Sequence, residues 1–321
     1  IWINNSVPFY WANKGVDQKI KHIKENDIKY NTLFWGSSRT QMHIYPKEFD
    51  KEMRGITKSF NLGYSSCRAE ELIFLLEEFI DKETNLVEDL DFVFLEIRPI
   101  FYDEKTLFTS RGKYCLNKKS KNFLLNYYEN SNLEYARKDI NKAFIEKKLG
   151  IGVLRDKIAY LVRSLFQNEN NLIGENGFLN RKKAIVLDHI NHLLSNHRED
   201  SLKILSTLQK RKHFAEACFE KQNRKLNLNE KIYLKKLNSI NDKLNEKGVK
   251  LVLFPTLRFQ NSNIIALIKK ANAVKIIDIS NPSIHPEYYD YQLSGDASHL
   301  NIKGARMYSQ DLAKGLKENL K

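Results

Sequence analysis

Cysteine is scarce in this chain: Cys67, Cys115 and Cys218 are the only three in 321 residues. They are far apart, and none belongs to a Cys-x-x-Cys pair, so no cysteine-based zinc or redox centre is indicated. The odd count leaves one disulfide open. Long apolar runs are also missing, since no stretch approaches the roughly 18 to 20 residues that span a bilayer. No signal peptide is recognisable.

Acidic residues are outnumbered, with 39 Asp and Glu against 53 Lys and Arg, and the net charge is +14. Such a balance favours anionic partners, which include nucleic acid, anionic lipid and acidic polymers. The basic clusters at 118–121, 181–183 and 210–212 lack the interleaved aromatic residues of a single-strand binding platform. We therefore do not expect nucleic-acid binding, and we interpret most lysines as solvated helix faces.

Short apolar runs alternate with helical patterns at both ends of the chain. The runs are rich in β-branched and aromatic residues, as expected of strands buried on both faces. They lie at 32–35, 59–62, 92–97, 250–254 and 275–279. Apolar positions recur at helical spacing between them. The alternation predicts an α/β fold: a doubly wound, flavodoxin-like, five-stranded parallel sheet with right-handed crossovers.

The alternation stops between residues 101 and 226, where the sequence is rich in Lys, Asn and Leu. No convincing buried strand occurs there, and helical patterns are found near 122–145, 153–166 and 182–210. The segment is too long for an ordinary loop. We predict a helical insertion between the third and fourth strands, which roofs or flanks the strand ends. Residues 31–100 and 227–321 then form the α/β domain.

Residues 1–30 form an N-terminal arm with an aromatic-rich start. The chain begins with Ile rather than Met, which suggests that its natural beginning is missing. The aromatic composition suits the interfacial belt outside a removed membrane helix. An arm packed on the domain fits equally well. The residues concerned are Ile1, Trp2, Ile3, Phe9, Tyr10 and Trp11.

A Gly36-Ser37-Ser38-Arg39 turn follows the first predicted strand. Glycine lets the backbone bend sharply, which exposes a hydroxyl and an amide N–H at the same point. A serine placed there can attack an ester carbonyl, and the amide can hold the oxyanion that forms. Gly63, after the second strand, can likewise offer its N–H at the sheet edge.

An Asp296-x-x-His299 motif precedes the final helical pattern. Imidazole titrates near neutrality, so His299 is the natural general base, and Asp296 can orient it. The carboxyl ends of parallel strands share one edge, so the long separation in sequence from Ser38 is no obstacle. His43 and His285 are alternative bases.

No metal or cofactor site is indicated. The three histidines closest together in sequence are His189, His192 and His197. They lie in a polar, charged stretch with no clear set of carboxylate ligands, so we do not predict a metal centre from them.

Together these residues resemble the SGNH/GDSL hydrolase superfamily. The nucleophile of its first block matches Ser38, the oxyanion glycine of its second block matches Gly63, and its final Asp-x-x-His matches Asp296 and His299. The resemblance covers about 31–100 and 227–316. Ser37 stands where the superfamily usually has Asp before the nucleophile.

The third block departs from the superfamily. Where Gly-x-Asn-Asp is usual after the third strand, this chain reads Leu95-Glu96-Ile97-Arg98-Pro99. The asparagine that completes the oxyanion hole is therefore missing. Arg98 can add positive charge at the same strand end, and Arg39 can bind an anionic group of the substrate. The alternative for both is a salt bridge, for example with Glu96.

The Gly-Ser-Ser-Arg variant is most similar to extracytoplasmic, membrane-anchored members of the superfamily. Those act with membrane-bound O-acyltransferases in alginate O-acetylation or teichoic-acid D-alanylation. The resemblance implies a serine acyltransferase or esterase with a Ser-His-Asp triad and no cofactor. Its partners would be an acyl donor, an anionic glycan or polymer, and a membrane-bound O-acyltransferase. It also implies an extracytoplasmic domain anchored by an N-terminal membrane helix absent from this sequence. The alternative is a catalytically weak glycan-binding or scaffold subunit.

Overall fold

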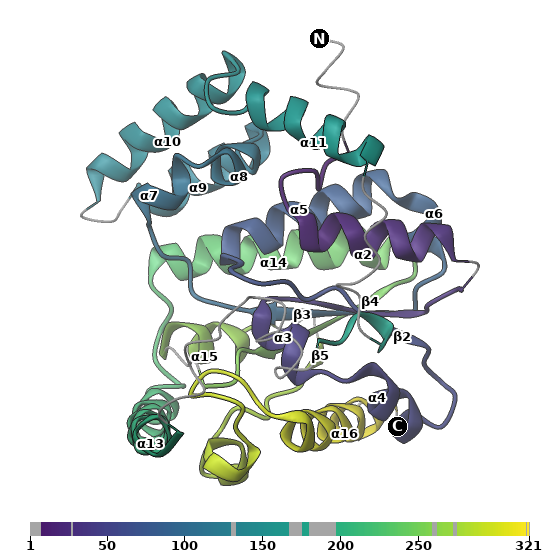
Figure 1. Cartoon of the computed structure of the whole chain (residues 1–321). Helices are drawn as coiled ribbons and strands as arrows, with labels where there is room; N and C mark the ends of the chain where they lie inside the picture. Colours follow the sequence, from purple (N-terminus) through teal and green to yellow (C-terminus); the bar gives the residue numbers. More distant parts are fainter. Residues whose placement is uncertain are drawn as a thin grey trace.

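A five-stranded, all-parallel sheet lies at the centre of the molecule (Figure 1). The computed structural model describes residues 8–26, 28–129, 133–166, 175–179, 197–258, 262–271, 275–318 and 320. The strands are β1 (Thr32–Trp35), β2 (Ser59–Asn61), β3 (Phe92–Ile97), β4 (Lys250–Pro255) and β5 (Lys275–Ile276). Their order is β2-β1-β3-β4-β5, so the predicted doubly wound α/β fold is confirmed.

The central strands bury both of their faces because nearly every residue in them is apolar. Successive side chains point to opposite faces, and they divide the interior into two cores. Leu33, Trp35 and Val93 belong to one core, whereas Phe34 and Phe94 belong to the other. Phe34 and Phe94 are paired across β1 and β3, and their ring centroids lie 4.8 Å apart.

Helices cover both faces of the sheet (Figure 1). One face carries α2 (Lys14–Glu25), α5 (Ala69–Lys82) and α14 (Leu228–Asn245), and the other carries α4 (Pro46–Met53) and α16 (Ile302–Glu318). The short helix α3 (Ser38–His43) follows β1 directly, α6 (Thr84–Glu88) precedes β3, and α15 (Ser262–Ile268) follows β4.

Between β3 and β4 the described residues before α14 are helical or irregular, with no strand, in agreement with the predicted helical insertion. The helices are α7 (Glu104–Leu107), α8 (Ser110–Tyr114), α9 (Lys118–Tyr128), α10 (Glu134–Lys148), α11 (Leu154–Phe166), η1 (Glu175–Gly177) and α13 (His197–Glu220). The pattern at 122–145 falls on two helices, α9 and α10. Residues 182–196 of the third predicted helix lie outside the described residues.

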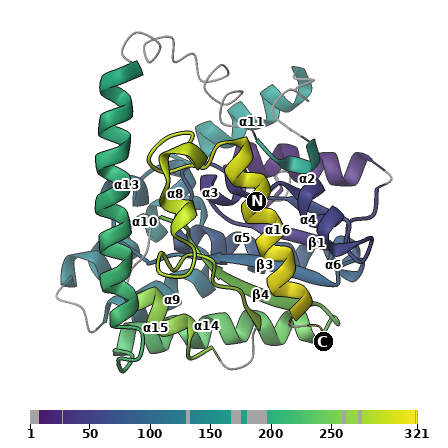
Figure 2. The ribbon, with the colours of Figure 1, turned by 90° about the horizontal axis from the view of Figure 1, so that it is seen from below.

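The insertion reaches two places on the domain. Helices α8 to α11 form a further layer outside α5 and α2 (Figure 1). Helix α13 runs beside the irregular segment that precedes α16 (Figure 2). This second position brings the insertion close to the residues that the sequence marks as functional.

The aromatic residues of the N-terminal arm divide between described and undescribed parts. Phe9, Tyr10 and Trp11 are buried, so these three pack on the domain. Ile1, Trp2 and Ile3 lie outside the described residues. Among the described helices, none has the length and apolar character to cross a bilayer. The three cysteines are buried, and none of them forms a disulfide bond.

Candidate active site

The serine turn, defined as residues 36–40, joins β1 to α3. Ser37 is the N-cap of α3, and its hydroxyl accepts a hydrogen bond from Arg39 N at 3.2 Å. Ser38 is therefore the first residue of the helix, where a backbone amide has no intrahelical acceptor. A Cβ atom on Gly36 would lie 1.8 Å from Thr40 Oγ1 and 2.5 Å from Glu96 Oε2, so only glycine fits there.

A single buried carboxylate, that of Glu96 on β3, fastens this turn. It accepts hydrogen bonds from Ser37 N at 2.6 Å, Ser37 Oγ at 2.8 Å, Thr40 Oγ1 at 2.5 Å and Thr256 Oγ1 at 2.7 Å. Burial by itself raises the pKa of Glu96, but the Arg98 guanidinium and these donors hold it below its usual value. The serine turn is thus tied to the sheet by an ionised side chain.

The histidine loop, defined as residues 294–300, lies just before α16. An antiparallel bridge between Ser294 and Leu300 closes it. Inside the loop, the Asp296 carboxylate accepts from Ser298 N at 2.6 Å and from His299 N at 2.8 Å. This local turn explains the three-residue spacing of the motif, because it brings the carboxylate back onto the histidine.

The two segments meet at one point. His299 Nδ1 lies 3.0 Å from Asp296 Oδ2, and His299 Nε2 lies 3.0 Å from Ser38 Oγ. With Nδ1–H donated to the carboxylate, Nε2 can accept the hydroxyl proton. The His299 and Asp296 side chains are 15% and 28% exposed, so the group can be reached from solvent. The structure thus brings together the three residues predicted to be catalytic.

Two arginines hold the histidine loop from outside. Arg258, three residues after β4, donates from Nη1 to the carbonyl oxygens of Asp296 and His299, both at 3.3 Å, and from Nη2 to Ser294 Oγ at 2.9 Å. Arg211, on α13 of the insertion, donates to Ala297 O at 2.7 Å. The position of the base therefore depends on guanidinium groups.

Positive charge gathers around the three predicted catalytic residues. Burial lowers the pKa of Arg258 to about 10 and that of Arg39 to about 10, and both remain protonated at neutral pH. Asp296 opposes this lowering in both groups and in Arg211. Arg39, predicted to bind substrate, is buried beside the nucleophile. The field at the site favours anions and developing negative charge.

The other predicted oxyanion donor, Gly63, is already engaged. Its amide N–H donates to Asn61 Oδ1 at 2.9 Å, and the Asn61 amide in turn donates to Thr40 O at 2.8 Å and Ile44 O at 2.7 Å. A Cβ atom on Gly63 would lie 2.4 Å from Gln41 N, so the loop is pressed against α3. The Ser38 amide is the better placed donor, and the oxyanion role of Gly63 stays a prediction.

Lys19 of α2 anchors the same loop from the far side. Its buried ammonium donates to Asn61 O at 2.8 Å, Gly63 O at 2.6 Å and Gly177 O at 2.7 Å. Three carbonyl acceptors use all three protons of the group. The loop after β2 is therefore fixed to the N-terminal helix and to the insertion.

Arg98 makes contacts that hold it in place. Its Nε lies 3.9 Å from Glu96 Oε1, which is the ion pair that the sequence left as an alternative. It also donates from NH1 to Cys67 O, and its own carbonyl accepts from the Tyr233 hydroxyl at 3.1 Å. A structural role is visible, and substrate binding by Arg98 stays a prediction.

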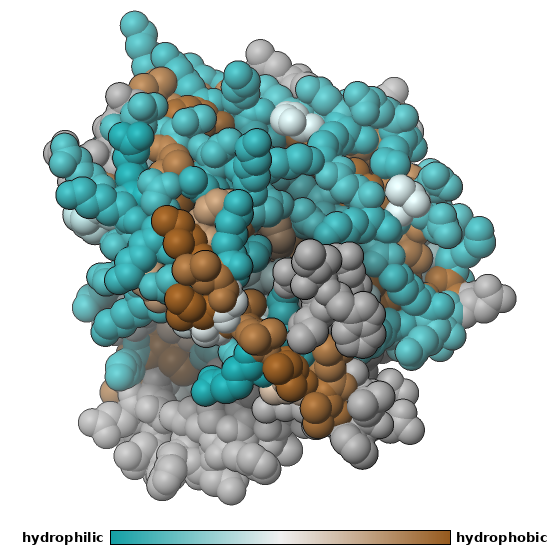
Figure 3. All heavy atoms as spheres, turned by 90° about the horizontal axis from the view of Figure 1, so that it is seen from above, coloured by the Kyte–Doolittle hydropathy of each residue, from teal (hydrophilic) through white to brown (hydrophobic). Residues whose placement is uncertain are grey.

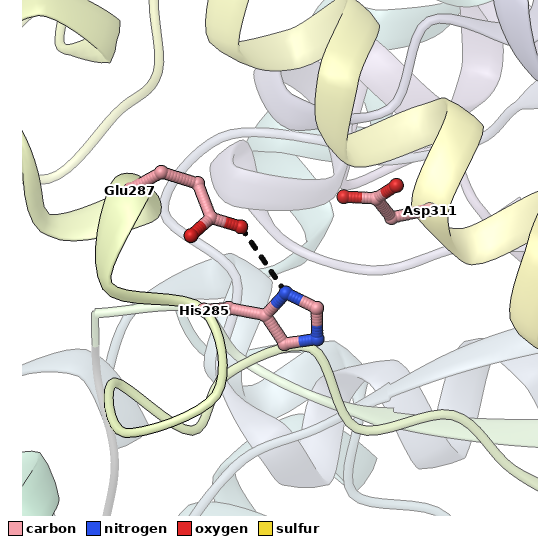
Figure 4. Close-up of side chains that lie close together, drawn as sticks. All are labelled: His285, Glu287 and Asp311. Atoms are coloured by element: carbon pink, nitrogen blue, oxygen red, sulfur yellow. Dashed lines mark hydrogen bonds and ion pairs between the residues drawn. The ribbon is translucent and has the colours of Figure 1, made fainter.

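Neither alternative base is hydrogen-bonded to Ser38. His43 is buried, with its ring centroid 5.9 Å from that of His299, and burial lowers its pKa well below the usual value. His285 Nδ1 instead lies 3.1 Å from Glu287 Oε1 (Figure 4).

His285, Glu287 and Asp311 offer potential metal ligands within 4.8 Å of one another. Asp311 faces the other two from α16 (Figure 4). However, its carboxylate already accepts from the Tyr288 hydroxyl at 2.6 Å and pairs with Lys314 at 2.8 Å. The lysine supplies the positive charge that a cation would bring.

Sequence reasoning missed the residues that position the triad. Glu96 entered only as a partner for an arginine, although a carboxylate inside an apolar strand is itself a strong signal. Arg258 lies three residues after the fourth strand, at the carboxyl edge of the sheet, and that placement could have marked it. Arg211 lies in a basic cluster on a helix and Lys19 in an amphipathic one, so neither stands out.

Comparison of the chain with protein families, curated proteins and solved structures finds no match. The fold and the geometry of the site are therefore the basis for the function proposed below.

Proposed function

We propose that the protein is a serine acyltransferase or esterase in which Ser38, His299 and Asp296 act as nucleophile, base and orienting acid. One observation carries the proposal: His299 lies 3.0 Å from the Ser38 hydroxyl through Nε2 and 3.0 Å from the Asp296 carboxylate through Nδ1. The half-buried setting of the three residues is consistent with attack on a substrate that reaches the sheet edge.

In the proposed reaction, Ser38 Oγ attacks the carbonyl carbon of an acyl donor and its proton passes to His299 Nε2. The Ser38 amide and the surrounding arginines stabilise the oxyanion. The leaving group takes the proton from His299 as the tetrahedral intermediate collapses to the acyl-enzyme. A glycan hydroxyl or water then gives its proton to His299 and attacks the acyl carbonyl. As this second tetrahedral intermediate collapses, the bond to Ser38 Oγ breaks and His299 returns the proton to Ser38 Oγ. No cofactor is needed.

The positive field favours an acidic acceptor, such as an anionic cell-envelope glycan or polymer. Arg39 and Arg258 lie on the nucleophile and base sides of the site, and both keep their charge. We further propose an extracytoplasmic location and action beside a membrane-bound O-acyltransferase, in line with the sequence resemblance. A donor supplied by such a partner would make transfer, rather than hydrolysis, the main reaction.

The small number of oxyanion donors at the site favours a second function, that of a binding or scaffold subunit. Glu96 stands where the resembled superfamily has its third block, and the Gly63 amide is bound to Asn61. A protein with few oxyanion donors could be a catalytically weak subunit that binds a glycan or scaffolds a membrane complex. Removal of one such donor typically costs 10² to 10³ in rate.

Labelling with a fluorophosphonate, read by peptide mass spectrometry, tests the proposal. We expect one adduct on Ser38, none in Ser38→Ala, and strongly slowed labelling in His299→Ala. Ser65→Ala removes an exposed hydroxyl nearby and should label as the wild type does. A folded wild-type protein that takes no label would contradict the enzyme and favour the binding subunit. Partition of a pre-formed acetyl-enzyme between water and an added acidic glycan separates esterase from transferase.

A further inference from the structure

Helix α11 of the insertion presents an apolar stripe to solvent. Leu154, Ile158 and Val162 recur every four residues, so they share one face of the helix, and each is about half exposed. The loop between α10 and α11 continues the stripe with Leu149 and Ile151, which are 70% and 53% exposed. These side chains lie on the outermost layer of the molecule.

The same face is visible from above in Figure 3, where an apolar band crosses a hydrophilic surface. The α10 and α11 helices lie on this side in Figure 1. An exposed apolar band on a hydrophilic surface marks an interaction surface more often than chance exposure does.

Lysines flank the band. A hollow of about 1100 Å³ between α9, α10 and α11 is lined by basic, aromatic, aliphatic and asparagine residues, and none of its lining residues is acidic. The lysines that line it are Lys118, Lys121, Lys147, Lys148 and Lys157. Lys118 and Lys148 are exposed, and neither has a carboxylate partner among the described residues.

The segment that contains the 149–153 loop and most of α11 also carries a net positive charge. Between residues 142 and 163 there are six basic and two acidic side chains. Both acids are already paired, Glu146 with Lys113 at 2.6 Å and Asp156 with Arg155 at 3.2 Å. This surface therefore combines exposed apolar side chains with unneutralised positive charge.

We propose that this surface, formed by α11, the 149–153 loop and the flanking lysines, docks on an anionic lipid bilayer. The apolar side chains would enter the boundary between headgroups and acyl chains, and the lysines would lie at the phosphates. Insertion of apolar side chains or attraction of lysines alone gives weak attachment to a bilayer, whereas the two together give stable binding. The charge complementarity selects a lipid surface over a neutral protein groove, and docking does not require the chemistry proposed at Ser38.

Cosedimentation with phosphatidylcholine vesicles, with and without phosphatidylglycerol, tests the lysines. We expect binding only when phosphatidylglycerol is present, and weaker binding at high salt. The pair Lys118→Gln and Lys148→Gln should lower the partition coefficient about twenty-five-fold, since each lysine near such a surface contributes about fivefold. The control pair Lys51→Gln and Lys270→Gln removes two exposed lysines elsewhere and should leave binding unchanged.

A second pair of variants tests the apolar band without changing charge. Leu154→Ser with Ile158→Ser should weaken binding by at least about tenfold, because buried aliphatic area is lost. Ile56→Ser with Ile284→Ser removes aliphatic side chains that are somewhat more exposed and lie outside this surface, and it serves as the control. Three results would each overturn the proposal: no binding to anionic vesicles, equal binding to neutral ones, or losses no larger than in the controls.

Discussion

The serine turn and the histidine loop deliver their side chains to one point, but opposite charges hold them. On the serine side, the buried carboxylate of Glu96 accepts from hydroxyl and amide donors of the serine turn and from a hydroxyl of the segment after β4. On the histidine side, Arg258 and Arg211 donate to main-chain carbonyls. The first fastening lies wholly within the α/β domain, whereas the second includes a residue of the insertion.

This difference indicates a division of labour. The nucleophile is fixed by Glu96, a buried residue of the central strand β3. The base is held on a loop whose stability depends partly on α13, which belongs to the insertion. Changes in the insertion should therefore affect proton transfer before they affect the position of the nucleophile.

The largest expected effect comes from the histidine loop itself. Asp296→Asn should lower kcat on small activated esters by about 10⁴, because the amide no longer favours the tautomer that accepts the serine proton. Asp290→Asn changes a nearby exposed acid that caps a short helix, and it should alter kcat little. A loss of less than tenfold in Asp296→Asn would mean that the carboxylate does not orient the base.

The matching change on the serine side is Glu96→Gln. Loss of the charge weakens four hydrogen bonds to a buried acceptor, which should cost about 2 kcal/mol in the free energy of unfolding. Activity should fall as well, because the turn loses its fixed position. Urea denaturation checks the first effect, and Glu88→Gln, an exposed acid, is the control. Unchanged stability would contradict the role assigned to this carboxylate.

Lowering the pH should remove the contribution of the ionised Glu96 carboxylate to the stability of the fold. The pKa of this group is lower in the folded than in the unfolded protein, so its stabilising contribution is present above the unfolded value. It is lost as pH falls through the folded value. The difference in unfolding free energy between wild type and Glu96→Gln should therefore shrink below about pH 4. If this difference in unfolding free energy grows on acidification, the pKa of Glu96 is raised rather than lowered by folding.

The two arginines should differ in their effect on the base. Arg258→Met removes donors from both Asp296 and His299, and kcat should fall about thirtyfold. Arg211→Met removes a contact to Ala297 at the loop tip, and a loss of about fivefold is expected. The pH profile of kcat distinguishes positioning from a general loss of folded protein, since only a misplaced base changes its shape. Equal losses would remove the distinction between core and insertion.

His43→Gln should have the smallest effect. The buried imidazole lies against the His299 ring but makes no hydrogen bond to Ser38, and burial keeps it neutral at physiological pH. We expect kcat to change by less than about threefold, measured on the same ester. A loss close to that of His299→Ala would make His43 part of the catalytic group after all.

Most of the fold could be predicted because strands buried on both faces produce distinct apolar runs. The ends were less certain: β5 stops at Ile276, three residues before the predicted end, since pairing rather than apolar character defines a strand. Ser38, Asp296 and His299 could be found because turn chemistry is local. The fastening by Glu96, Arg211 and Arg258 could not, because it depends on which distant segments become neighbours.

The hydrogen bond from Arg211 to the carbonyl of Ala297 makes the insertion a structural support of the histidine loop. Shortening residues 101–226 to a simple connection would still allow β3 and β4 to pair in register. Such a trimmed protein would keep its nucleophile on a rigid turn while the imidazole beside it lost a brace. Recombination of this domain with a different insertion would therefore have to supply a new donor at the same place.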